Sequence, residues 1–128
     1  MKNLITKENL IGYILFKVPS ICKYINDNDE SPFLFLNYTF VPILKNYLVE
    51  CLFNTNNKDE VINVLQVLED MANSDDLEVQ NVLQLAVFEN LSLSSKEWET
   101  LKNTLLPNSL NSLNFFESKN TLSVKSLT

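Results

Sequence analysis

The sequence predicts an all-α protein, a single compact bundle of five to seven helices. Three observations favour this fold class. The 128 residues include only one glycine and four prolines, too few for a sheet with many tight turns. Apolar residues recur at helical spacing through most of the chain. The hydrophobic fraction of 45% is typical of one globular domain with its own core. We expect residues 1–118 to form this domain and 119–128 to be a polar, frayed tail.

The first helix is expected to begin at Thr6, as its cap, and to end near Val18, because the apolar residues between them follow helical spacing. Pro19 suits the first turn of a second, short helix. The polar run at 26–31 is a predicted loop.

An apolar segment rich in aromatic residues opens at Pro32 or Phe33 and ends near Phe53. Pro42 lies within it and cannot donate the helical hydrogen bond, so a break, a kink or a new helix start is expected there. We interpret these aromatic side chains as part of the core, and stacking on a ligand is the alternative. A short strand near 33–41 stays an alternative, because aromatic and β-branched residues also favour strands.

A helix from about Lys58 to Asn73 is predicted by an apolar stripe on one side and polar side chains on the other. Ser74 or Asp75 is the expected cap of the next helix, which extends to about Leu91. That helix is apolar on two sides, so we expect it to lie centrally.

Ser94 and Glu97 have the S-x-x-E spacing of a capping box and predict the start of another helix. Trp98 on this helix is interpreted as a residue at the edge of the core, with an interface anchor as the alternative. Pro107 ends the helix or starts a last, short one.

Two absent residue types and the scarcity of glycine restrict the chemistry. Without histidine the chain lacks the usual general base and metal ligand. Without arginine it lacks bidentate phosphate recognition, and its only glycine, Gly12, cannot build a phosphate-binding loop. The acidic pairs also lack the alternation of a calcium loop. We therefore expect no catalytic residue, no metal, no cofactor and no nucleic-acid partner.

The predicted location is the cytoplasm, with no membrane partner, because no apolar run reaches the length of a membrane span. The apolar stretch near the N-terminus contains Lys17 and lacks a small-residue cleavage site, so we interpret it as a folded helix. Cys22 and Cys51 are expected to be reduced thiols, although a disulfide between them stays open.

Negative charge is concentrated in one part of the chain. Residues 59–99 carry ten carboxylates and one lysine, which gives this stretch a charge of −9 in a chain of −6. A local anionic face attracts a cationic partner. Neighbouring like charges lower the stability of the fold, which favours a role for them outside it. The alternative is a solvated face that aids solubility. The candidate partner-binding residues are Asp59, Glu60, Glu69, Asp70, Asp75, Asp76, Glu78 and Glu89.

Residues 67–91 contain the pattern Leu68-Glu69-x-Met71-Ala72-x-Ser74-x-Asp76-x-Glu78-Val79-x-Asn81, followed by Glu89-x-Leu91. This stretch, about a fifth of the chain, resembles small α-helical bacterial immunity proteins of contact-dependent growth inhibition and polymorphic toxin systems. The resemblance implies a non-enzymatic protein that binds and neutralises a cognate toxin domain, often a basic nuclease, by covering its active site with an acidic face. The alternative is a helical scaffold or adaptor that self-associates or binds a neighbouring subunit.

Overall fold

The computed structural model describes residues 5–22, 37–55, 57–89 and 91–127, and these ranges contain helices and no strand. The predicted all-α class is confirmed. In chain order the elements are α1 (Leu10–Lys17), α3 (Asn37–Val49), the π-helix η2 (Glu50–Asn54), α4 (Lys58–Ala72), α5 (Leu77–Val82), the π-helix η3 (Leu83–Phe88), α6 (Ser95–Thr104) and α7 (Pro107–Leu127).

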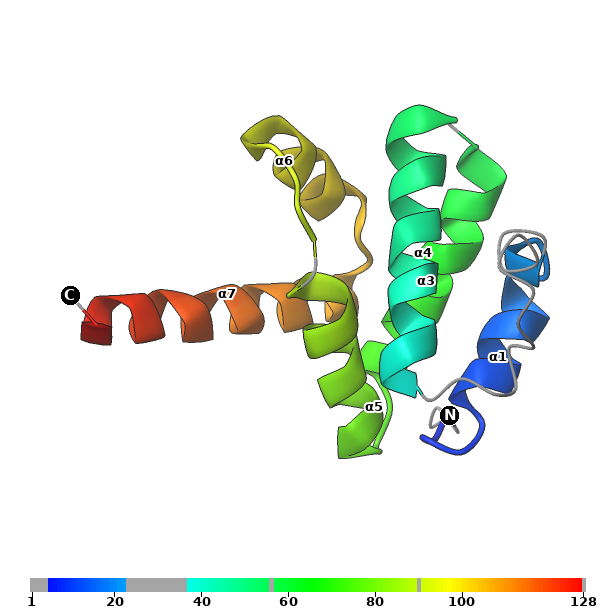
Figure 1. Cartoon of the computed structure of the whole chain (residues 1–128), viewed down its shortest axis with the longest axis horizontal. Coiled ribbons are helices and arrows are strands. Elements are labelled where there is room, and N and C mark those ends of the chain that lie inside the picture. Colours follow the sequence, from blue (N-terminus) through cyan, green and yellow to red (C-terminus); the bar gives the residue numbers. More distant parts are fainter. Residues whose placement is uncertain (1–4, 23–36, 56, 90, 128) are drawn as a thin grey trace.

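The helices α1, α3, α4 and α5 pack into one bundle (Figure 1). Helix α3 with η2 runs beside α4 in the opposite direction, α1 packs against both, and η3 packs against α3. The largest side chains that are fully buried are apolar; they are Phe40, Phe88, Leu10, Ile14, Ile21, Leu44, Leu48, Leu68, Met71, Leu83 and Leu101. Burial of these side chains is the main free-energy contribution that holds the bundle together.

Helix α1 begins later than the sequence predicted. The Asn9 side chain accepts a hydrogen bond from the Thr6 amide at 2.8 Å, and the Asn9 amide bonds to the Thr6 carbonyl. These two contacts close a turn ahead of the helix, so Leu10 is the first helical residue. Leu10, Ile14 and Val18 are buried at the predicted spacing. The predicted loop at 26–31 and the start of the aromatic segment lie outside the described residues.

Helix α3 continues through Pro42, so the expected break or new start at this residue is wrong. The strand alternative is wrong for the described residues 37–41, which are helical. The proline sits in the first half of α3, and the neighbouring Phe40, Val41 and Leu44 are fully buried. Packing of this apolar face outweighs the missing hydrogen bond.

The π-helices η2 and η3 extend α3 and α5 with hydrogen bonds that span five residues. The Thr55 amide bonds to the Glu50 carbonyl, and the Glu89 amide to the Gln84 carbonyl, both at 2.9 Å. Each π turn inserts one residue and rotates the faces that follow. Helix α5 with η3 is central, as expected, since it packs against α3, α4 and α7.

Helix α4 matches the predicted range, and the capping box of α6 is confirmed. The Glu97 amide donates to Ser94 Oγ at 3.2 Å, and the Ser94 amide donates to Glu97 Oε1 at 3.0 Å. The expected cap of α5 was misplaced, because Asp76 caps this helix through a 2.9 Å bond from the Glu78 amide. Ser74 instead accepts the Asp76 amide at 3.0 Å.

Helix α7 begins at Pro107 as predicted but is much longer than the short final helix expected. Its first turns pack against α4 and η3, and it then extends away from the bundle (Figure 1). Its last turns include residues 119–127, which the sequence assigned to a frayed tail. Among the helices that the structure describes, none is long and apolar enough to cross a bilayer.

Candidate functional site

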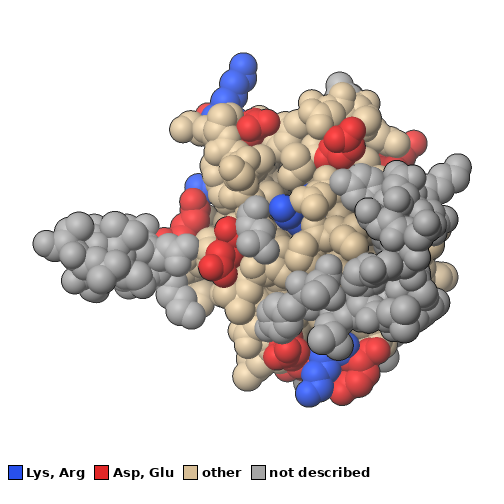
Figure 2. Space-filling model, viewed as in Figure 1, with Lys and Arg blue, Asp and Glu red and all other residues tan. Residues whose placement is uncertain are grey.

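The eight predicted partner-binding acids do not form one cluster. Asp59 and Glu60 lie in the first turn of α4. Asp75, Asp76 and Glu78 lie around the start of α5, which follows the opposite end of α4. Helix α4 has 15 residues, which at about 1.5 Å per residue separates its ends by about 22 Å. Figure 2 shows acidic side chains in several separate groups on the face in view, with lysines among them. The charge concentrated in the sequence is therefore spread over the fold.

Glu60 is buried, with 9% of its surface exposed. Its carboxylate accepts hydrogen bonds from the Tyr47 hydroxyl at 2.7 Å and from Asn63 Nδ2 at 3.2 Å. Burial raises the pKa of Glu60, but hydrogen bonds from Ser20, Tyr47 and Asn63 outweigh it and hold the pKa below its ordinary value. Glu60 therefore ties α4 to α3 and to the segment after α1, and it is not available to a partner.

Glu69 is also buried, with 8% exposed, and it caps α7 from the side of α4. It accepts the backbone amides of Asn108 and Ser109 at 3.0 and 2.9 Å, and Asn108 Nδ2 at 2.7 Å. The first amides of a helix have no partner inside it, and a negative charge there also suits the helix dipole. These bonds hold the pKa of Glu69 below its ordinary value although burial raises it. The residue joins α7 to the bundle.

Asp70 and Asp76 are partly exposed but also bind within the protein. Asp70 accepts hydrogen bonds from the Tyr13 hydroxyl of α1 and from Gln66 Nε2. Asp76, besides capping α5, accepts the Lys7 amide at 2.8 Å, which lowers the pKa of its carboxyl. Burial and the contact with Asp70 raise the pKa of the Tyr13 hydroxyl.

The other four of the eight acids lie at the surface of the protein. Asp59, Asp75 and Glu89 are exposed and Glu78 is partly exposed. We call these four the surface acids. Helical periodicity in the sequence already separates the two buried acids from the surface acids. Glu60 lies four residues before the buried Val64, and Glu69 lies four residues after the buried Leu65. Charge alone does not show this difference, because buried and exposed carboxylates have the same charge.

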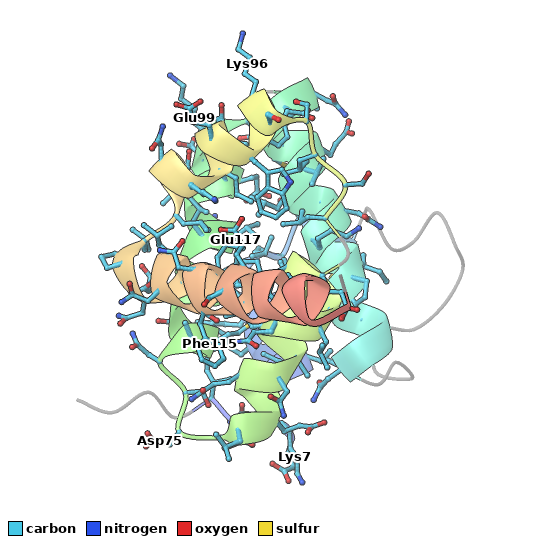
Figure 3. All side chains as sticks on the ribbon, turned by 90° about the vertical axis from the view of Figure 1, so that its left-hand side faces the viewer. Lys7, Asp75, Lys96, Glu99, Phe115 and Glu117 are labelled. Carbon is cyan, nitrogen blue, oxygen red and sulfur yellow. The ribbon has the colours of Figure 1, made fainter. Side chains whose placement is uncertain are left out.

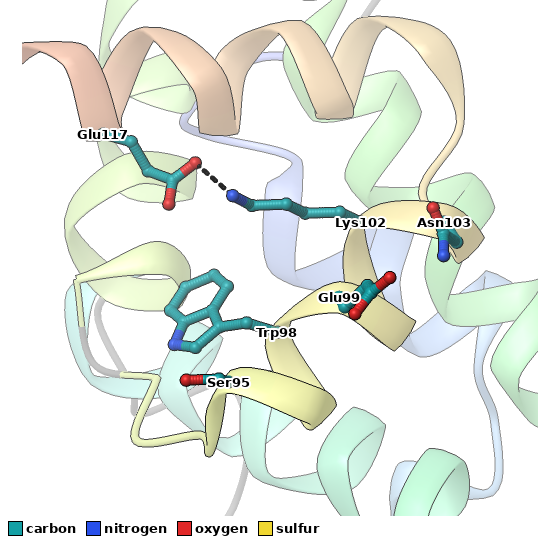
Figure 4. A pocket seen from close by; sticks show the side chains of 6 residues that line it. All are labelled: Ser95, Trp98, Glu99, Lys102, Asn103 and Glu117. Carbon is teal, nitrogen blue, oxygen red and sulfur yellow. Dashed lines mark ion pairs between the residues drawn. The ribbon is translucent and has the colours of Figure 1, made fainter.

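A pocket of about 430 Å³ lies between α6 and α7, and none of the predicted site residues lines it. Its lining residues are Ser95, Trp98, Glu99, Lys102, Asn103 and Glu117. Figure 4 shows the Trp98 ring and the side chains of Lys102 and Glu117 directed into the same space. In Figure 3, Glu117 lies on the side of α7 that faces α6, and Phe115 on the other side.

An ion pair spans the α6–α7 pocket. Lys102 Nζ lies 2.8 Å from Glu117 Oε1, with the two side chains 37% and 40% exposed. Trp98 is partly buried against the core and one helical turn from Lys102. The spacing of Ser95, Trp98 and Lys102 on one face of α6 was visible in the sequence. The approach of Glu117 was not, because it depends on how α7 leaves the bundle.

A second, more apolar hollow of about 290 Å³ lies where α4, η2 and the end of α6 meet. Cys51 is one of its lining residues and is a buried, free thiol. Burial raises the pKa of Cys51, which makes the thiolate scarce and the group a poor nucleophile. Cys22 is also free and partly exposed. The expectation of two unpaired thiols is therefore confirmed. Among the described residues, no three His, Cys, Asp or Glu side chains are grouped so that they could hold a metal ion.

Comparison with known proteins gives one family. The model of a family described as Domain of unknown function (DUF7674) matches residues 11–117, which span α1 to the pocket-lining turn of α7. Searches of curated proteins and of solved structures gave no match. Because the match covers most of the chain, including every element that builds the bundle and the α6–α7 pocket, the protein belongs to the DUF7674 family.

Proposed function

We propose that this protein is a cytoplasmic immunity protein that binds and neutralises a cognate, basic toxin domain without catalysing a reaction. The observation that carries the proposal is the charge of residues 59–99, ten carboxylates against one lysine. The resemblance of residues 67–91 to bacterial immunity proteins gives the class of partner.

The fold supports a binding role for some of these acids and assigns others to the interior. The surface acids project from α4, from the start of α5 and from the end of η3, so they can approach a large cationic partner at several points. Such dispersed charges act mainly by accelerating encounter, and their effect falls as salt screens it. A nuclease domain, whose own substrate is a polyanion, has the complementary surface.

The test is capture of the partner from the native host by the tagged protein, first at low and then at high salt. We expect a basic polypeptide that is retained at low salt, that arrests growth when it is expressed alone, and that is harmless when it is expressed together with this chain. Recovery of a polypeptide that is not toxic, or a toxin whose effect this chain does not relieve, would contradict the proposal.

A self-associating scaffold is a second candidate function, and one observation favours it. Helix α7 extends from the bundle, and Phe115 on it is 59% exposed (Figure 3). An exposed aromatic residue on a projecting helix suits a contact with another subunit. Light scattering on the purified protein over a range of concentrations distinguishes the two, because the scaffold must form oligomers that the variant Phe115→Ser loses.

A further inference from the structure

The α6–α7 pocket combines two features that recognise a cation. Its lining includes the aromatic ring of Trp98 and two carboxylates, Glu99 and Glu117, against one ammonium group, that of Lys102. A tryptophan face attracts cations more strongly than the other aromatic rings do. Carboxylates beside it add direct ionic hydrogen bonds.

The protein's own Lys102 already shows that a cation fits beside Glu117. The ion pair is short, at 2.8 Å, but both side chains are more than a third exposed (Figure 4). Ion pairs that exposed are weak because water competes for both groups. A cation from outside that makes more contacts than Lys102 can therefore take its place.

An arginine side chain makes these additional contacts. The planar guanidinium can stack on an indole ring and donate two parallel hydrogen bonds to a carboxylate at the same time. A lysine ammonium is a point charge and does not combine the two. The pocket volume of about 430 Å³ leaves room for the guanidinium and its aliphatic stem.

We propose that the α6–α7 pocket receives an arginine side chain from the partner protein, with its guanidinium on Trp98 and paired with Glu117, while Lys102 turns outward. Glu99 adds a second negative charge at the rim. The inference rests on the proposed function for the identity of the partner as a basic protein, but the recognition of arginine is a property of the pocket alone.

The experiment uses Trp98 as its own reporter, because it is the only tryptophan in the chain and gives a single indole N–H signal in a ¹⁵N-labelled sample. The probe is N-acetyl-arginine amide. Its matched control is N-acetyl-citrulline amide, which has almost the same shape and no charge. We expect a saturable shift of the indole signal with the arginine probe, and binding about tenfold weaker with the citrulline probe.

Two variants distinguish recognition of arginine by the α6–α7 pocket from a purely structural role of its side chains. Glu117→Gln should weaken binding of the arginine probe several-fold, whereas Lys102→Gln should strengthen it, since it removes the competing cation. Glu8→Gln is the charge-matched control, because Glu8 is exposed, does not line the pocket and lies outside residues 59–99. The remaining amide signals report that each variant is folded.

Equal shifts with the two probes, no shift at the solubility limit of the arginine probe, or unchanged binding to Glu117→Gln would each overturn the inference. The outcome is independent of the toxin. If a toxin is captured and the arginine probe does not bind, only the role of the pocket fails; if the probe binds and no toxin is captured, only the proposed function fails.

Discussion

Glu69 shows how one side chain can determine the position of a whole helix. Both of its oxygens accept hydrogen bonds from the first turn of α7, and the residue is almost completely buried. A buried carboxylate of this kind has no water to replace its donors. Its chemistry belongs to folding, although its charge made it a candidate for partner binding.

We expect Glu69→Gln to lower the free energy of unfolding by about 2–4 kcal/mol, because glutamine is uncharged, keeps only one acceptor oxygen and places its NH2 group against the donors of Asn108. Denaturation by urea, followed by circular dichroism, measures the change. The control Asp59→Asn, an exposed acid on the same helix, should change the value by less than about 0.5 kcal/mol. Equal effects of the two substitutions would show that Glu69 does not hold α7.

The lowered pKa values of Glu60 and Glu69 predict a dependence of stability on acid. Each group has a lower pKa in the folded than in the unfolded protein. Its contribution to the free energy of unfolding is therefore fully present above the ordinary pKa of 4.5. The contribution is lost as the pH falls below 4.5 through the lowered folded pKa. The difference in unfolding free energy between wild type and Glu69→Gln should therefore narrow across this range. A constant difference in urea titrations on both sides of 4.5 would contradict the assignment.

At the scale of elements, local capping signals fixed where helices begin. The capping box Ser94–Glu97 has both of its bonds, and Pro107 occupies the first position of α7, where a missing amide costs nothing. Asp76, and not Ser74 or Asp75, caps α5, because Ser74 Oγ also donates to the Ile5 carbonyl at 2.7 Å. A contact 69 residues away in sequence thus shifted the start of a helix.

The capping box gives a prediction for α6. Ser94→Ala removes the acceptor for the Glu97 amide and should lower the free energy of unfolding by about 1 kcal/mol. Ser92→Ala, an exposed serine that precedes the helix, is the control and should have almost no effect. Thermal and urea unfolding of the two variants give the comparison. If Ser92→Ala is as harmful as Ser94→Ala, the loop and not the cap is responsible.

At Pro42, in contrast, tertiary packing outweighs the tendency of the local sequence to break the helix. A proline within a helix argues for a break, yet α3 continues because the buried residues around it pack against η3 and α4. The strength of that packing is decided by residues of α4 and η3, which lie outside this segment of the sequence. The sequence of α3 alone therefore does not predict the strength of this packing.

At the scale of the whole molecule, the charge pattern predicts how the cognate toxin associates. The combined variant Asp59→Asn, Asp75→Asn and Glu89→Gln removes three exposed charges. We expect the association rate to fall, and its dependence on salt to weaken, because fewer charges steer the encounter. Stopped-flow mixing with the captured toxin measures both quantities.

The control for this prediction is Glu8→Gln, an exposed acid outside residues 59–99. Its effect for each charge removed should be smaller than that of the combined variant. An association rate that responds only to total charge, irrespective of position, would assign the acids to solubility and leave the partner surface elsewhere.

Much of the motif at 67–91 has a structural explanation. Glu69 caps α7, Ser74 binds the segment before α1, and Asp76 caps α5 and holds Lys7. The resemblance therefore rests in part on residues that build the fold. Asp75 and Glu89, by contrast, are exposed, and they carry the hypothesis of partner binding.

The sequence by itself determined the all-α class, the range of α4, the start of α6 and the excess of acid, because helical periodicity, capping pairs and charge are properties of neighbouring residues. Only the tertiary structure decided which acids are buried, how far α7 extends, and that Glu117 meets Lys102 beside Trp98. These depend on contacts between residues far apart in the chain, where burial and desolvation decide whether a charge stabilises the fold or remains available to a partner.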